Sequence, residues 1–499
     1  AQQAASSRVS TPSASAVEET WRAQQRLIMV NADGPSLQPG SRTYERAWIR
    51  DGASIGTAMC FTGHAGMMRE FVDWYGAYQY ESGKVPCVVD KRGPDPVPEH
   101  DSHGEYIHAV ATVYRFTQDR AFLERHWPRV VRAVAYLDSL VAERSTPEYQ
   151  FGEGTFDERG IRVPKKAAFG LVPQSISHEG YSAKPMHSYW DSFWTVRGFK
   201  DAAFLAGELG REERTGYLER AVAYRKHMAM SVVLARQVTE AEWVPGCVEL
   251  GDFDATSTAV AVWPTDEWRQ EGGIPRGLFE STFEKYWWYF HERRRGEVQW
   301  KDYTPYEVRI IGTALRLGEE DGRWLGRAHE LNEWFLKDQR PPGWRQWGEV
   351  VYRDKKFAGF IGDYPHTWVG ADYLNSVRAM FIDEREGAPG KGGELVLGLG
   401  ITEDWLNAAG DRGVGINNAP TWWGTMSYTV RREPDGVVRW ALSPELRPGA
   451  GVSALTLMFP RAVRSPKVVR GGCEASPVDH RRVKLSGSFE APIEVEVQE

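Results

Sequence analysis

The sequence lacks the features of a membrane-spanning chain and of a disulfide-stapled one. No stretch of about 18 or more consecutive apolar residues occurs in its 499 residues, so we expect no membrane insertion. Its four cysteines are widely spaced and form no C-x-x-C pair: Cys60, Cys87, Cys247 and Cys473. We interpret them as mostly free and buried. One disulfide is possible, but the spacing does not indicate it.

An excess of basic residues is missing too, and so are the short motifs that hold cofactors. Lys and Arg number 61 against 68 Asp and Glu, a formal net charge of −7, whereas a nucleic-acid binder normally carries a basic stripe. No P-loop or dinucleotide fingerprint is present, and no H-x-x-x-H pair or Cys/His cluster indicates a metal site. We therefore expect no nucleic-acid partner, no cofactor and no metal.

Tryptophan, in contrast, is abundant. Hydrophobic residues make up 41% and charged residues 26% of the chain, which is ordinary for a globular protein, but 21 residues are Trp. Large flat rings with one polar handle suit sugar-binding clefts, because pyranose rings present flat C–H faces. Core packing accounts for part of this number, so the tryptophans are a hint of carbohydrate binding rather than a proof.

The chain divides into four segments that differ in composition and in hydrophobic periodicity. Residues 1–16 are rich in Ser, Ala and Thr, and we expect them to form a flexible N-terminal segment. Residues 17–385 show apolar residues at three- and four-residue spacing, which is typical of helices, as in "RVVRAVAYLDSLVAE". A Pro/Gly/charge-rich linker, 386–392, precedes the short β-type runs of 393–499, which predict a small antiparallel β domain.

The start of the chain bears on its location. It begins at Ala1 without Met, which fits a mature end left by signal-peptide removal or the boundary of an expressed segment. We favour a secreted or periplasmic protein over a cytoplasmic one, and a monomer or small homo-oligomer.

Six times in the helical part, a helix is predicted to begin just after a cluster of polar and aromatic residues. Capping explains part of this pattern, because Asp and Ser near a helix start satisfy free N–H groups. It does not explain why Trp, Tyr and His accompany the carboxylates. Decorated helices that alternate with plain ones predict a mainly α fold, an (α/α)6 barrel whose inner helices start at one rim and form a deep cup. The clusters carry Asp51; Asp101, His103 and Glu105; Asp191; Asp252 and Asp254; Asp302 and Glu307; and Asp363 and His366.

Such a cup could supply the two carboxyl groups that cleave a glycosidic bond with inversion. One must be protonated and the other must activate water, ~6.5–9.5 Å away. Asp191, in "HSYWDSFW", is a candidate acid because burial between rings disfavours its charged form; the competing interpretation is a helix cap. Glu349, in "PPGWRQWGEVVYRD", is the candidate base because it has no cap to make, although it could be a plain surface-loop residue. Glu179, in "SISHEGYSAKP", is a rival for either role.

Several motifs resemble those of known carbohydrate-active enzymes. "ERAWIRDGA" resembles the tryptophan–x–arginine–aspartate element of glucoamylases and related α-glucan hydrolases, and "PHTWVGADYLNSVRAMF" resembles their final inner helix. "SYWDSFW" is similar to the acid element of trehalases and processing α-glucosidases. A helical barrel followed by a β domain also resembles α-L-rhamnosidases, whose acidic cluster is not recognisable here. The resemblance implies an (α/α)6 barrel and an exo-acting, inverting, α-glycosidic hydrolase of glucoside type.

The resemblance also assigns roles to residues. It makes Asp191 the general acid and Glu349 the general base, and it implies that Trp48, Arg50 and Asp51 contact the terminal sugar. An oligosaccharide or polysaccharide is then the expected partner. Other residues of the same clusters and loops are expected to bind substrate: Asp101, His103, Glu179, Tyr189, Trp190, Trp194, Trp347, His366 and Trp368.

Three other functions fit the same pattern. A glycoside phosphorylase would use phosphate in place of water and would need extra Arg, Lys or His near the base. A polysaccharide lyase could use a Tyr/His pair such as Tyr181 and His178. A non-catalytic glycan-binding protein would bind oligosaccharide without turnover.

Overall fold

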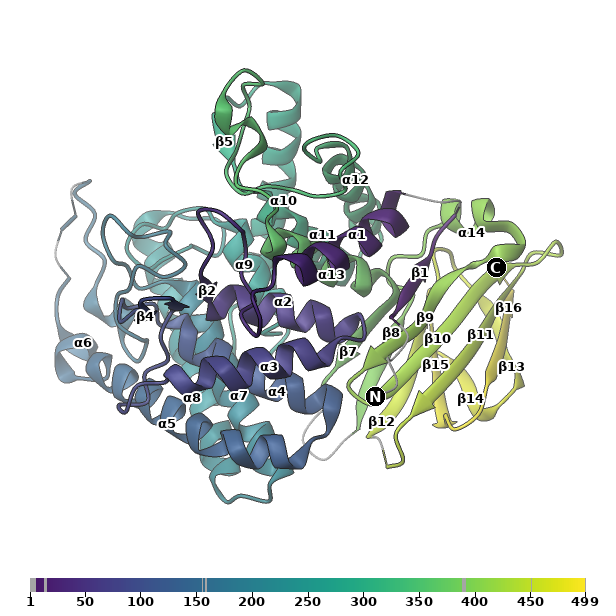
Figure 1. Ribbon diagram of the computed structural model, residues 1–499, viewed down its shortest axis with the longest axis horizontal. Coiled ribbons are helices and arrows are strands. Elements are labelled where there is room, and N and C mark those ends of the chain that lie inside the picture. Colours follow the sequence, from purple (N-terminus) through teal and green to yellow (C-terminus); the bar gives the residue numbers. More distant parts are fainter. Residues whose placement is uncertain are drawn as a thin grey trace.

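A computed structural model of the protein describes residues 6–12, 16–154, 156–157, 159–387, 392–449 and 451–498. It shows a helical part followed by a β-rich C-terminal part, as the sequence predicts, with the strands packed beside one end of the helices (Figure 1).

Six helices form a closed ring of contacts, and we call them the inner helices. Each contacts the next along the chain, and the last contacts the first. They are buried on almost every side; in α4, all residues from 101 to 115 are buried. Helices surrounded in this way lack the polar stripe of a surface helix. The inner helices are α2 (Ile49–Phe61), α4 (Asp101–Thr117), α7 (Tyr189–Glu208), α9 (Ala255–Val262), α11 (Arg309–Leu317) and α13 (Thr367–Phe381).

A second set of helices packs on the outside of this ring. In α5, the buried residues Phe122, Trp127, Val130 and Leu137 recur along one face while the opposite face is exposed. This amphipathic pattern is the one that helical periodicity in the sequence predicts. Each outer helix contacts an inner one: α1 (Ala16–Asn31), α3 (Ala65–Tyr75), α5 (Arg120–Arg144), α8 (Glu213–Thr239), α10 (Arg276–Arg295) and α12 (Arg323–Lys337).

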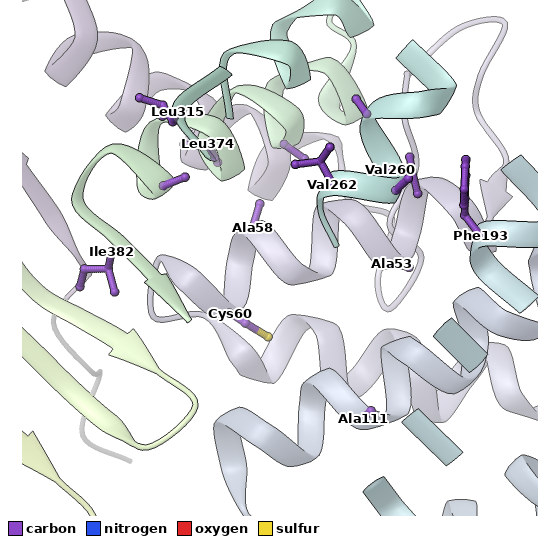
Figure 2. Packing of buried hydrophobic residues seen from close by; sticks show 14 of the residues in the cluster. Ala53, Ala58, Cys60, Ala111, Phe193, Val260, Val262, Leu315, Leu374 and Ile382 are labelled. Carbon is purple, nitrogen blue, oxygen red and sulfur yellow. The ribbon is translucent and has the colours of Figure 1, made fainter. Parts of the chain in front are cut away.

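The centre of the helical part is apolar. Figure 2 shows buried side chains contributed by all six inner helices, with small residues such as Ala53 and Ala58 on α2 beside branched ones on α9 and α11. Small side chains let inner helices approach closely, and the larger ones fill the remaining space. The labelled residues on these helices are Ala53, Ala58, Cys60, Ala111, Phe193, Val260, Val262, Leu315 and Leu374.

Short elements occupy the loops of the helical part. They comprise one helix and two small antiparallel sheets, with strand orders β2-β3-β4 and β5-β6. Their bounds are α6 (Pro147–Phe151), β2 (Ala47–Trp48), β3 (Val88–Asp90), β4 (Gly93–Pro94), β5 (Asp302–Tyr303) and β6 (Val351–Tyr352).

Two sheets make up the β-rich part, with strand orders β1-β9-β10-β11-β16-β13 and β14-β15-β12-β8-β7. In β11, Val438, Trp440 and Leu442 are buried while their neighbours are more exposed, the two-residue period of a strand with one covered face. The elements are β7 (Ile382–Arg385), β8 (Gly393–Leu397), α14 (Glu403–Ala409), β9 (Val414–Thr421), β10 (Gly424–Arg432), β11 (Val437–Leu446), β12 (Val452–Met458), β13 (Arg464–Arg470), β14 (Gly472–Pro477), β15 (Arg482–Ser488) and β16 (Ile493–Gln498).

The structure also shows how the predicted N-terminal segment and linker are held. Within segment 1–16, β1 (Arg8–Ser10) pairs with β9, because an edge strand offers free backbone groups. Residues 1–5 and 13–15 lie outside the described residues. Strand β7 joins the second sheet before the predicted linker 386–392, of which 388–391 lie outside the described residues. The linker's Glu386 accepts from Arg115 and Arg197 at 2.7 and 2.9 Å, which ties it to the inner helices.

Three properties of the described residues bear on function. No helix among them is long and apolar enough to cross a membrane. No group of three or more His, Cys, Asp or Glu in the described part of the chain could hold a metal ion. The four cysteines are free; Cys473 is partly exposed and the other three are buried.

Candidate active site

The first turns of five inner helices line one small cavity of about 80 Å³. That volume is below the ~300–1,000 Å³ of typical small-molecule sites, and it suits one sugar ring only if the exposed side chains at its edge move apart. Helices α2, α7, α9, α11 and α13 contribute residues, and three loops complete the wall. The lining residues are Tyr44, Trp48, Arg50, Asp51, His178, Glu179, Trp190, Thr256, Ser257, Tyr306, Arg309, Glu349 and Trp368.

Glu349 is a buried carboxylate in the cavity wall. Its backbone pairs with Asp363, which fixes the loop ahead of α13. The Tyr306 hydroxyl donates to Glu349 Oε1 at 2.5 Å, while Oε2 has no hydrogen-bond partner within the described residues. Burial raises the pKa of Glu349, and hydrogen bonds from Tyr306 and Tyr44 pull it back. One oxygen is therefore held and the other is free to accept a proton.

The nearest imidazole to Glu349 does not neutralise it. His366 Nε2 lies 3.5 Å from Glu349 Oε2, but burial lowers the pKa of His366 to about 3. The ring is therefore neutral at ordinary pH, and its Nδ1 accepts from Val369 N to cap α13. Within the described part of the chain, Glu349 thus forms no ion pair with an arginine or lysine.

Arg50 and Asp51 combine a structural role with exposure to the cavity. Arg50 Nη1 donates to Glu99 at 2.6 Å and to Asp101 at 3.3 Å, and its Nε lies 3.9 Å from Asp51. Burial raises the pKa of Asp51 well above its usual value; Arg50 opposes this shift, and the charges of Glu349 and Glu179 reinforce it. Both glutamates are therefore close enough to Asp51 to act on it.

Aromatic rings and a second arginine form the rest of the wall. Arg309 bonds Asp372 at 2.6 Å, and its guanidinium lies 5.1 Å from the centre of the Trp368 ring and 5.6 Å from that of Trp190. Cation–π contacts and the ion pair together fix the rings at defined angles. Rings held in this way offer flat apolar faces to a ligand.

Glu179 reaches the cavity from a loop that comes before α7. Trp48 Nε1 donates to Glu179 Oε1 at 3.2 Å. The residue is exposed, in contrast to Glu349, and its backbone φ of +65° is in the left-handed region. The two glutamates therefore reach one cavity from separate loops, one buried and one solvent-accessible.

Asp191 is close in sequence to Glu179 but is not among the residues that line the cavity. It is fully buried, and its two oxygens contact the hydroxyls of Ser175 at 2.6 Å and Ser177 at 2.9 Å. Burial, reinforced by the charge of Asp101, raises the pKa of Asp191 to about 8. The carboxyl is buried as the sequence predicts, but its oxygens contact serine hydroxyls and do not line the cavity, so direct proton donation to a ligand does not fit this geometry.

The other expected site residues divide into two groups. Trp48, Arg50, Asp51, Glu179, Trp190, Glu349 and Trp368 line the cavity. The remaining ones lie behind its wall, where each has a packing or hydrogen-bonding role: Asp101 accepts from Arg50 and Trp190, His103 accepts from Val85 N, Tyr189 bonds Ser231, Trp194 packs near His108, Trp347 donates to Phe335 O, and His366 caps α13.

Some lining residues were not expected from the sequence. Thr256 and Ser257 follow the "GDFD" cluster, and Tyr306 and Arg309 flank Glu307. The carboxylate of the second cluster, Glu307, does not line the cavity. It bonds Arg293 and Tyr286 instead. Tyr44 lies in a loop without a recognisable motif, and only its contacts reveal it.

Comparison with known proteins relates this fold to glycoside hydrolases. No protein-family model matches the chain. A protein of Methanocaldococcus jannaschii named an uncharacterized glycosyl hydrolase is 31% identical over 145 residues, which cover 28% of this chain and 23% of that protein.

Solved structures of α-L-rhamnosidases share the fold. The enzyme from Dictyoglumus thermophilum matches with a TM-score of 0.58 and 12% identity, over 99% of this chain and 50% of that one. The Streptomyces avermitilis enzyme, complexed with L-rhamnose, matches with a TM-score of 0.56 and 12% identity, over 99% of this chain and 42% of that one. The chain thus spans half or less of the length of these proteins, and such low identity concerns the fold alone. The glucoamylase and trehalase resemblances are not confirmed by these matches.

Proposed function

We propose that this chain is a glycoside hydrolase that removes a terminal sugar with inversion, on an (α/α)6 barrel. The closed ring of six inner helices with a partner outside each supports the barrel. The observation that carries the function is the pair Glu349 and Glu179, which reach one aromatic-walled cavity from separate loops. The rhamnosidase fold and the short match to a named glycosyl hydrolase agree with it.

Glu349 is the general base in this proposal. A base needs a carboxylate that can take a proton from water, and Glu349 Oε2 is buried and free of hydrogen bonds within the described residues. The Tyr306 hydroxyl orients the group by donating to Oε1, and burial raises the pKa of Glu349. A more basic carboxylate is a better proton acceptor for the attacking water.

Glu179 is the general acid, in place of Asp191. The geometry supports this choice because Glu179 lines the cavity, whereas Asp191 is sealed behind it. A bound sugar would cover Glu179 and remove it from water, which favours the protonated form that an acid needs. Trp48 holds the Glu179 side chain at the cavity mouth.

The cavity then binds the terminal sugar. Rings from Trp48, Trp190 and Trp368 offer faces for C–H contacts, while Arg50 and Asp51 offer donors and acceptors for hydroxyl groups. The small volume of the cavity suits a single terminal sugar, which favours exo action. An α-glucoside remains the substrate favoured by the sequence motifs, and an α-L-rhamnoside is the alternative favoured by the fold.

Two rival reactions, phosphorolysis and elimination by a lyase, agree less well with the residues that line the cavity. Phosphorolysis needs uncompensated positive charge for phosphate, yet carboxylates balance the charges of both lining arginines, Glu99 that of Arg50 and Asp372 that of Arg309. Arg50 Nε has no hydrogen-bond partner within the described residues, so it can still donate to a neutral hydroxyl. A lyase Tyr/His pair is also engaged elsewhere, because Tyr181 donates to Asp252 and His178 bonds Ser257. Hydrolysis is therefore the reaction that we favour.

A glycan panel followed by proton NMR tests the proposal. We expect one terminal sugar to be released from α-glucosides or α-L-rhamnosides, and the anomer first formed to be opposite to that of the substrate. Product of retained configuration would refute the inverting mechanism. Phosphate-dependent formation of a sugar phosphate, or binding without turnover, would favour the phosphorylase or the glycan-binding protein.

The pH profile of kcat/KM should report Glu349. Activity needs its ionised form, so a raised pKa places the acid limb at a higher pH than an ordinary glutamate would. Tyr306→Phe removes a hydrogen bond that favours the carboxylate. The acid limb should then move up by roughly one to two pH units, as expected for a bond to a charged group.

A matched variant controls this shift. Tyr373→Phe removes a buried hydroxyl that has no hydrogen-bond partner among the described residues, outside the cavity. Its acid limb should stay where the wild-type limb lies. An unmoved limb in Tyr306→Phe would show that Glu349 is not the group that titrates.

A further inference from the structure

The loop that carries Glu179 adopts an unfavourable backbone conformation. Ser177 and Glu179 both have positive φ, +52° and +65°, although neither is glycine. Non-glycine residues rarely adopt such conformations, which persist only where the surroundings over-determine them. Something must therefore hold this loop.

Asp191, on the first turn of α7, holds the loop through its two carboxyl oxygens. One of its oxygens contacts the Ser175 hydroxyl at 2.6 Å and the other contacts the Ser177 hydroxyl at 2.9 Å. Ser177 N donates to Ser175 Oγ at 2.7 Å, and Glu179 N donates to Ser177 O at 2.6 Å. A continuous chain of short bonds thus runs from α7 to the backbone of the proposed acid.

A second contact holds the same loop from the side. His178 Nε2 lies 3.0 Å from Ser257 Oγ, and Ser257 Oγ donates to Asp254, the N-cap of α9. His178 and Ser257 both line the cavity. His178 lies between Ser177 and Glu179, the two residues of this loop with positive φ. Contacts with Asp191 and Ser257 therefore fix the loop between α7 and α9.

We propose that Asp191 is a positioning residue, which clamps the strained Ser175–Ser177 segment so that Glu179 points into the cavity. This inference rests on the proposed function, since it assigns the acid to Glu179. The clamp explains why a fully buried carboxyl group lies so near the site without facing it.

The clamp requires a side chain at position 191 that can both donate and accept a hydrogen bond. Ser177 Oγ lies 2.9 Å from both Asp191 Oδ1 and Ser188 Oγ, but its hydroxyl has one hydrogen to donate. A protonated Asp191 would donate to Ser177 and accept from Ser175, and the raised pKa of this carboxyl, about 8, favours that form at neutral pH. Asparagine offers the same pattern, one donor and one acceptor.

The test compares two substitutions at this position. Asp191→Asn should keep kcat/KM within about tenfold of wild type on a glycoside with a poor leaving group. Asp191→Ala removes the clamp and should lose about 100-fold on that substrate, the cost of a small misplacement of a catalytic group. On a dinitrophenyl glycoside, whose departure needs little protonation, Asp191→Ala should lose less than tenfold.

Combination with Glu179→Gln shows whether Asp191 acts through that residue. The double variant Glu179→Gln/Asp191→Ala should be no slower than Glu179→Gln alone. Losses that multiply, or equal losses on both leaving groups, would indicate general structural damage and overturn the inference. Ser177→Ala should show a weaker form of the Asp191→Ala defect, whereas Ser192→Ala, a buried serine on the same helix bonded to Tyr224 and Ser188 O, should not.

The outcomes separate this inference from the proposed function. An inactive Asp191→Asn beside an inactive Glu179→Gln would refute only the clamp and return Asp191 to the role of proton donor. A fully active Glu179→Gln would refute the acid assignment and the clamp with it. A wild-type protein without turnover would refute the proposed function itself.

Discussion

Glu349→Gln should lower kcat by about 10²–10⁴-fold, the contribution typical of one general acid or base. Glutamine has nearly the same shape as glutamate, and its amide oxygen can still accept from the Tyr306 hydroxyl. It cannot take a proton from water at neutral pH, so the loss should appear in kcat while KM changes little. Steady-state kinetics on the glycoside identified by the panel measures both.

Binding and chemical rescue provide the controls for this variant. Three tryptophans, Trp48, Trp190 and Trp368, line the cavity, so binding of the product sugar should still change Trp fluorescence in Glu349→Gln. In Glu349→Ala, azide needs no base: it bonds to the anomeric carbon as the glycosidic C–O bond breaks and Glu179 protonates the leaving oxygen. Formation of the inverted glycosyl azide would support the assignment. More than about a tenth of wild-type activity in Glu349→Gln would contradict it.

Glu179→Gln should lose about 10²–10⁴-fold on substrates with poor leaving groups, because the departing oxygen then leaves without a proton. The same variant should stay within about tenfold of wild type on a dinitrophenyl glycoside, whose leaving group is stable as an anion. Rates on the two substrates are the measurements.

An exposed loop glutamate provides the matched comparison. Glu153→Gln makes the same substitution at a side chain that is 81% exposed and outside the cavity. It should leave both rates unchanged. Equal losses on the good and the poor leaving group in Glu179→Gln would rule out proton donation by Glu179.

Much of the fold could be predicted from the sequence. Apolar periodicity in segments such as α5 predicts helices, and the turn residues 434–436 lie between the paired strands β10 and β11 as such turns do. The polar–aromatic clusters at the helix starts predict a cup, and residues from the first turns of five inner helices line one cavity. Local patterns of this kind depend only on neighbouring residues.

The choice between carboxylates was harder. "YWDSFW" predicts a buried acidic group at Asp191, and it is buried, but the sequence does not reveal which side of the wall it faces. Glu179 is only a rival for either role in the sequence, and the structure favours it by placing it in the cavity wall while Asp191 lies outside that wall. Contacts between loops, such as that from Trp48 to Glu179, span 131 residues of chain and leave no local signal.

The sequence by itself determined where helices and strands form and which polar clusters open the helices, because these follow from the hydrophobic period and from capping at each site. Only the tertiary structure decided which acidic side chains share a cavity. The direction of a carboxylate depends on backbone angles and on hydrogen-bond partners from distant segments, and neither is written in the residues beside it. Asp191 and Glu179 are twelve positions apart in sequence, yet Glu179 lines the cavity while Asp191 is buried against two serine hydroxyls.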